Sequence, residues 1–191
     1  MPNSEQSNEE LQTDGATTSA SPADPAVVGR ANAPVIRAVL DTSALVPPHL
    51  RRELQVAAQA GLYVGYWSPW IIAELNRVLT WRWIERTTPP DLSRANERRC
   101  SVAAHTMMEL LLTTFQLVET LPPYPPAWEA LTDRWDHPVW AAAKVSQAQY
   151  VVSENTHDYP PQEADGHYRH EGIEYLSSEA FMRLVAGTDL E

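Results

Sequence analysis

Short apolar segments alternate with longer segments of helical periodicity, and this alternation is the feature that most limits the possible folds. The apolar segments lie at 35–40, 62–67, 150–152 and 172–176, with a further short strand candidate at 116–119. Helical patterns cover 48–60, 68–79 with a continuation through 80–86, 92–115, 137–147 and 177–185. Strands separated by helices form parallel sheets with helices on both faces. The sequence therefore predicts a three-layer α/β/α fold with a mostly parallel central sheet.

The first 33 residues differ in composition from the rest of the chain. They are mainly Ser, Thr, Asn, Gln, Glu, Ala and Pro, with almost no large apolar side chain. Such a segment cannot bury enough surface to offset the entropy lost on ordering. We therefore expect a disordered N-terminal tail at 1–33 and one folded domain at 34–191.

The sequence also carries signals about its compartment. It lacks a secretion signal at its start, and it has no run of about 20 apolar residues that could span a membrane. A single cysteine, Cys100, excludes an internal disulfide framework, which agrees with a reducing compartment. We expect a cytoplasmic protein without a membrane segment.

Polar side chains follow two of the predicted strands directly. Asp41 comes at the end of the strand at 35–40, and the strand at 150–152 leads into Ser153, Asn155 and Asp158. Binding sites of parallel α/β sheets form where the strands end at their carboxyl edge. These side chains are therefore expected to lie near one another.

Two further carboxylates lie on helices that begin at this edge. Glu74 follows Ile71 by three residues and precedes Val78 by four, so it shares the apolar face of its helix. Asp136 lies just before the helix at 137–147, whose apolar, small-residue start predicts close packing. Clustered carboxylates repel one another unless a cation joins them, and an all-oxygen set suits Mg²⁺ or Mn²⁺.

Each of these residues also has a purely structural interpretation. Asp41 and Asp136 are both well placed to cap the helix that follows. Glu74 could pair with Arg77 on the adjacent turn, and Asn155 with Asp158 is typical of a turn. Their common position at one edge, in one sequential order, favours a functional interpretation of the set.

The order of four motifs resembles the PIN-domain ribonucleases, a family that includes many bacterial toxin nucleases. The matching segments are LDTS, SPWIIAELNRVL, DHPVWAAAK and VVSENTHDYP, and the resemblance covers about residues 35–180. It implies a PIN-like fold and an acidic metal pocket. Carried over to this chain, the metal-binding acids are Asp41, Glu74 and Asp136, and Ser43 matches the small hydroxyl or amide residue after the first acid.

The fourth position departs from the family pattern. Many members have an aspartate where this chain has Asn155, with another acid nearby that corresponds to Asp158. An asparagine can coordinate or orient through its carbonyl oxygen, but it contributes no charge. The resemblance assigns both residues to the catalytic pocket.

The activity implied by the resemblance is hydrolysis of RNA phosphodiester bonds by an endoribonuclease that uses Mg²⁺ or Mn²⁺. Asp41 and Asp136 would hold the ion, and Glu74 would fix the attacking water. The implied partners are RNA, single-stranded or in structured loops, a cognate antitoxin if the protein is the toxin of a type II toxin-antitoxin pair, and a second copy in a homodimer. The alternative is a catalytically weak PIN-fold module that binds RNA or a protein without cleavage.

A basic stretch provides the candidate RNA-binding surface. The net charge of the chain is -11, which argues against nucleic-acid binding through bulk charge, but residues 77–99 are net positive. Within them, Arg77 and Arg82 could pair with phosphates while Trp81 stacks on an unpaired base. Two alternatives remain: arginines lying over a partly buried tryptophan pair, or a surface for a protein partner.

Overall fold

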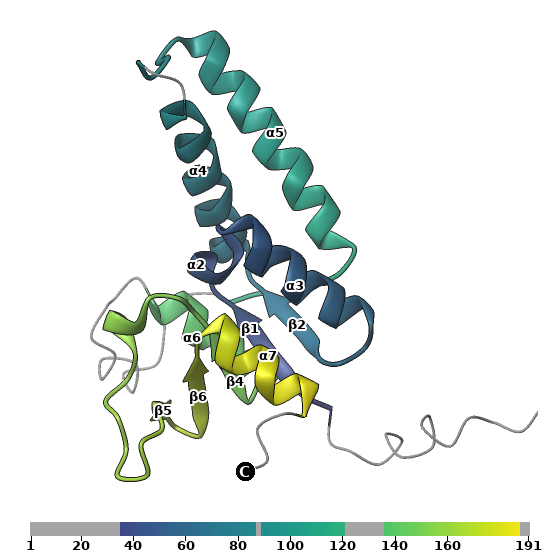
Figure 1. The fold of residues 1–191 in the computed structure, drawn as a ribbon, viewed down its shortest axis with the longest axis vertical. Helices are drawn as coiled ribbons and strands as arrows, with labels where there is room; N and C mark the ends of the chain where they lie inside the picture. The colour runs from purple at the N-terminus through teal and green to yellow at the C-terminus, as the bar shows by residue number, and fades with distance from the viewer. Residues whose placement is uncertain (1–34, 87–88, 121–135, 188–191) are drawn as a thin grey trace, which may run out of the picture. The chain divides into compact units, whose positions relative to one another are not determined.

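The computed structural model describes residues 35–86, 89–120 and 136–187 (Figure 1). The tail expected to be disordered, 1–33, lies outside the described residues, so that prediction remains untested. In the part that is described, no helix is long and apolar enough to cross a membrane.

Strands and helices alternate along the described chain, as the sequence predicts. The strands are β1 (Arg37–Leu40), β2 (Val64–Trp67), β3 (Gln116–Leu117), β4 (Tyr150–Val152), β5 (Arg169–His170) and β6 (Ile173–Leu176). The helices are α2 (Thr42–Leu45), α3 (Pro48–Gln59), α4 (Pro69–Glu85), α5 (Arg94–Leu112), α6 (His137–Ser146) and α7 (Ser178–Ala186), and η3 (Thr156–Asp158) is a single 3₁₀ turn.

The six strands form one sheet in the order β3-β2-β1-β4-β6-β5. Every neighbouring pair is parallel except β5 with β6, which is antiparallel. The predicted three-layer α/β/α fold with a mostly parallel sheet is thereby confirmed. The central position of β1 places its carboxyl end, followed by Asp41, between the ends of β2 and β4.

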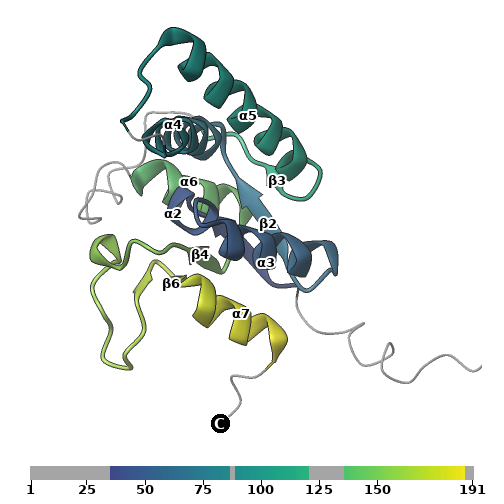
Figure 2. The same cartoon turned by 45° about the horizontal axis from the view of Figure 1, so that its top comes forward.

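The register of the central strands decides which side chains share a face. Val39 lies opposite Val151, and Val151 lies opposite Tyr175 in the next strand. Because paired residues of parallel strands point to the same side, these three side chains face α6. Helix α7 lies on the side of the sheet away from α6 (Figure 2). Its Phe181 packs against Tyr150, with ring centroids 6.0 Å apart.

Local signals explain where several helices begin and end. The Ser68 hydroxyl accepts a hydrogen bond from the Ile71 amide at 3.4 Å, and Pro69 occupies the first turn of α4, as expected of a cap followed by proline. Gly61, just after α3, adopts a positive φ of 72°, which costs glycine nothing. These ends agree with the sequence-based expectations.

Some features were not expected from the sequence. The short helix α2 and the edge strand β5 are additional, and the helix predicted at 92–115 is shorter, running from Arg94 to Leu112. Four-residue and two-residue elements are too short to show a periodic pattern, because one helical turn already takes 3.6 residues.

Candidate functional site

A small cleft at the carboxyl edge of the sheet brings together residues from β4, β6, α6 and the segments after β1 and β4. Its lining consists of Asp41, Asp136, Val139, Val151, Ser153, Asn155, Asp158, Tyr159 and Tyr175. The space inside is about 10 Å³, which is about what one water molecule needs. Four of the sequence-predicted site residues thus share one cleft, whereas Glu74 does not line it.

Asp41 is fixed in place by its neighbours. The side chain is only 8% exposed, and its Oδ2 accepts hydrogen bonds from the Ser43 amide (3.3 Å), the Ser43 hydroxyl (2.5 Å) and the Ser153 hydroxyl (2.9 Å). The bond from the Ser43 amide caps α2, so the capping interpretation of Asp41 is correct. All three bonds go to Oδ2, and none of them occupies Oδ1.

Asp136 behaves differently from an ordinary helix cap. It precedes α6, but its backbone is helical (φ -83°, ψ -12°) and its side chain makes no capping hydrogen bond. The carboxylate instead lines the cleft together with Asp41. The structural interpretation of Asp136 as a cap is therefore wrong.

Glu74 lies beside the cleft rather than in it. Its Oε2 accepts a hydrogen bond from the Thr42 hydroxyl at 2.9 Å, one residue along the chain from Asp41. Its Oε1 is 3.8 Å from Nη2 of Arg77, so the predicted pair on adjacent turns is present, at a distance that gives little stabilisation at a surface. Thr42 thus connects α4 to the end of β1.

Asn155 and Asp158 form the predicted turn and also line the cleft. The Asn155 side-chain amide donates to Asp158 Oδ2, and the Asp158 amide donates to the Asn155 carbonyl at 3.3 Å. The Asn155 backbone amide donates to the Ser153 hydroxyl at 3.1 Å. The turn is therefore linked through Ser153 to Asp41.

Tyr175 is a cleft residue that the sequence analysis missed. It is 4% exposed, and its hydroxyl has no hydrogen-bond partner among the described residues. Burial and the negative charges of Asp136 and Asp41 raise the pKa of Tyr175 above its usual range, so the phenol stays protonated. The alternation of apolar and polar residues at 173–175 marks Tyr175 as facing the same side as Ile173. That signal indicates an ordinary core tyrosine and does not by itself indicate a place in a site.

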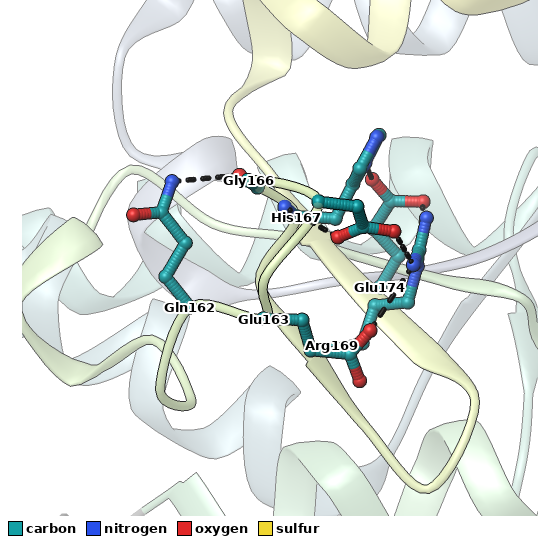
Figure 3. Close-up of polar contacts among 7 residues, drawn as sticks. Gln162, Glu163, Gly166, His167, Arg169 and Glu174 are labelled. Atoms are coloured by element: carbon teal, nitrogen blue, oxygen red, sulfur yellow. Dashed lines mark hydrogen bonds and ion pairs between the residues drawn. The ribbon is translucent and has the colours of Figure 1, made fainter.

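The hairpin that carries Tyr175 is held by polar contacts (Figure 3). Arg169 pairs with Asp165 at 2.5 Å and with Glu163 at 3.1 Å, and His167 contacts Glu174 at 2.5 Å. The Tyr175 amide donates to the carbonyl of Tyr168 at 2.8 Å. The contact of His167 with Glu174 and the bond from the Tyr175 amide to Tyr168 join this segment to β6.

The donors around the cleft fit a hydrated divalent cation better than a dehydrated one. Among the residues that the structure describes, no group of three or more His, Cys, Asp or Glu side chains is close enough to hold a metal ion. Asp41 and Asp136 nevertheless line one cleft beside the neutral oxygens of Ser153 and Asn155. Mg²⁺ commonly binds through one or two carboxylates and keeps several waters, so this oxygen set is suited to it.

The predicted basic surface lies on α4, which packs along α5 where the two helices extend away from the sheet (Figures 1 and 2). A groove of about 550 Å³ is lined by Arg77, Val78, Trp81, Arg82, Glu85 and Arg86. Trp81 is 53% exposed, whereas Trp83 is partly buried against the core and lines a second pocket with Arg82 and Arg86, so the alternative of arginines lying over a partly buried tryptophan pair stays open. We name these six residues the α4 groove.

Comparisons with known proteins leave the family open. No family model matches the chain, and no curated protein matches it. Among solved structures, the chain is similar to PAE2754 from Pyrobaculum aerophilum, with 14% identity, a TM-score of 0.44, and coverage of 80% of this chain and 96% of that one. Membership of the PIN-domain family therefore stays a proposal.

Proposed function

We propose that this protein is a metal-dependent ribonuclease of the PIN-domain type, which hydrolyses RNA phosphodiester bonds with Mg²⁺ or Mn²⁺. The observation that carries the proposal is the shared cleft of Asp41 and Asp136, two aspartates 95 positions apart in the sequence. Two carboxylates in one confined space repel each other, and a cation compensates that repulsion.

The residues of the cleft have distinct roles in this proposal. Asp41 and Asp136 would hold the ion, which when bound lowers the pKa of water and offsets charge that develops on the phosphate. Ser43 and Ser153 orient Asp41 by donating to its Oδ2. Their bonds keep that oxygen fixed, so that Oδ1 keeps a constant direction.

Glu74 is proposed to accept a proton from the attacking water. Because Glu74 lies beside the cleft, this water would reach it from outside the cleft. The Thr42 hydroxyl holds one of its oxygens, and Arg77 lies 3.8 Å from the other. That ion pair is long and its arginine is mostly exposed, so an RNA phosphate can compete for Arg77 at little cost. Glu74 would then be released from its partner when substrate binds.

Metal-dependent cleavage is the direct test of this proposal. The purified full chain should cut single-stranded RNA in the presence of Mn²⁺ or Mg²⁺, and a chelator should abolish the activity. Activity that persists in excess chelator would rule out the proposed mechanism. A genome that places a small antitoxin gene immediately upstream would further favour a toxin-antitoxin pair, and the antitoxin would then be the proposed protein partner.

Substitution of Arg82 tests the RNA-binding role of the α4 groove. Arg82→Ala should weaken RNA binding and lower the slope of log affinity against log salt by about 0.7, because each phosphate contact to a single strand releases counterions. Arg52→Ala is the matched control, since Arg52 is an exposed arginine on α3 and does not line the groove. An unchanged salt slope for Arg82→Ala would assign the groove to a protein partner instead, such as an antitoxin or a second copy.

A second candidate function is a PIN-fold module that binds RNA or protein and cleaves weakly or not at all. Two observations favour it: the described residues contain no three-ligand acidic group, and Glu74 lies outside the cleft. This candidate predicts RNA binding that is independent of Mn²⁺ and no cleavage above that of a chelated control. The cleavage assay therefore separates the two functions.

A further inference from the structure

The buried hydroxyl of Tyr175 lacks a hydrogen-bond acceptor among the described residues. It is a buried donor that lines the cleft and has no partner among the described residues. A buried polar group without a hydrogen bond is destabilising, so a group that enters the cleft is needed to accept a hydrogen bond from this hydroxyl. Tyr159, which packs against it with ring centroids 5.7 Å apart, has no such requirement because its hydroxyl donates to the Ser153 carbonyl at 2.5 Å.

The surroundings restrict what the missing acceptor can be. The space of about 10 Å³ admits one water-sized group and no phosphate. Asp41 and Asp136 line the same cleft as Tyr175. An acceptor in this space therefore lies close to Tyr175 and to both aspartates.

We infer that Tyr175 is a positioning residue for the divalent cation: its hydroxyl donates a hydrogen bond to the one water molecule for which the cleft has room, and this water would belong to the hydration shell of an ion held by Asp41 and Asp136. This inference rests on the proposed function for the presence of the cation. It gives a function to a buried hydroxyl that phenylalanine at the same core position would lack. Mg²⁺ and Mn²⁺ suit the arrangement because such ions retain water that the surrounding groups must orient.

The test compares two buried tyrosines in the full chain. Tyr175→Phe removes the hydroxyl that lacks a partner, whereas Tyr63→Phe removes one that donates to the Leu54 carbonyl at 2.9 Å. Tyr63 is equally buried, and it does not line the cleft. For each variant, the Mn²⁺ dissociation constant is measured from the electron paramagnetic resonance signal of free Mn²⁺, and the unfolding midpoint is measured without metal.

We expect the two variants to have different effects: one should weaken Mn²⁺ binding without lowering metal-free stability, and the other should lower metal-free stability alone. Tyr175→Phe should bind Mn²⁺ about tenfold more weakly, as is typical when an outer partner of a metal site is lost, with an unchanged or higher metal-free midpoint. Tyr63→Phe should lower the metal-free midpoint, because it removes the hydrogen bond from the buried Tyr63 hydroxyl to the Leu54 carbonyl, and should bind Mn²⁺ like the wild type.

Three outcomes would overturn the inference. Mn²⁺ affinity of Tyr175→Phe within twofold of the wild type would show that the hydroxyl does not act on the ion, while the proposed function would stand on wild-type cleavage. A metal-free midpoint lowered as much as in Tyr63→Phe would show that the hydroxyl already has a partner without metal. Absence of Mn²⁺ binding by the wild type would overturn both the inference and the proposed metal site.

Discussion

Asp41→Asn is expected to abolish RNA cleavage, with a loss of at least about a hundredfold, and to abolish the stabilisation by Mn²⁺. A divalent cation supplies several kcal/mol of transition-state stabilisation, and each 1.36 kcal/mol is about tenfold in rate. In the wild type, Mn²⁺ should raise the melting temperature because it binds only the folded state. The amide that replaces one carboxylate oxygen removes the charge on which both effects depend.

The same substitution should affect the metal-free protein only slightly. Asparagine caps a helix about as well as aspartate, so the bond from the Ser43 amide is retained. The hydroxyl bonds from Ser43 and Ser153 lose their charge assistance, while the repulsion from Asp136 disappears. We expect these opposite effects to leave the free energy of unfolding within about 1 kcal/mol of the wild type.

Asp165→Asn is the matched control for this experiment. Asp165 is an exposed aspartate in the segment before β5, where it pairs with Arg169, and it does not line the cleft. Its variant should cleave RNA and respond to Mn²⁺ like the wild type. Wild-type cleavage by Asp41→Asn would contradict the nuclease proposal, because the cleft would then have no part in the reaction.

Phe181→Ala is expected to lower the free energy of unfolding by about 3–5 kcal/mol, the usual cost of removing a buried aromatic ring. Phe181 is fully buried and joins α7 to the sheet through an edge-to-face contact with Tyr63 at 4.8 Å and a contact with Tyr150. The change is measured by equilibrium urea denaturation. No other single truncation that we propose should cost the fold as much.

Met182→Ala is the comparison for Phe181→Ala. Met182 is the next residue of α7 and is only half-buried, so its truncation should cost about 1 kcal/mol, well below the value for a fully buried side chain. Equal losses for the two variants would show that α7 is not docked through Phe181.

Local patterns in the sequence were sufficient for the layers of the fold. Apolar runs identified the central strands, and the cap at Ser68 and the glycine at position 61 marked a helix start and a helix end. The carboxyl-edge position of Asp41 followed from the same patterns, because strands joined by helices run parallel and end at one edge. These features depend on residues that are close in sequence.

Which side chains meet within that edge was decided by tertiary structure alone. Ser153 reaches Asp41 across 112 positions, and Glu74, predicted to join the acids, is held by Thr42 beside the cleft instead. Asp41 and Asp136 are alike as candidate caps in the sequence, yet only Asp41 caps.

Tyr175 shows why the sequence determines the elements of the fold, whereas the tertiary structure determines the site. Its sequence context indicates a strand residue that faces inward, but its place in the cleft depends on the register of β6 against β4, which sets Tyr175 opposite Val151. A shift by one residue would turn the phenol to the opposite face of the sheet. Periodicity is a property of neighbouring residues and fixes the elements, whereas register and helix packing join distant residues and fix the site.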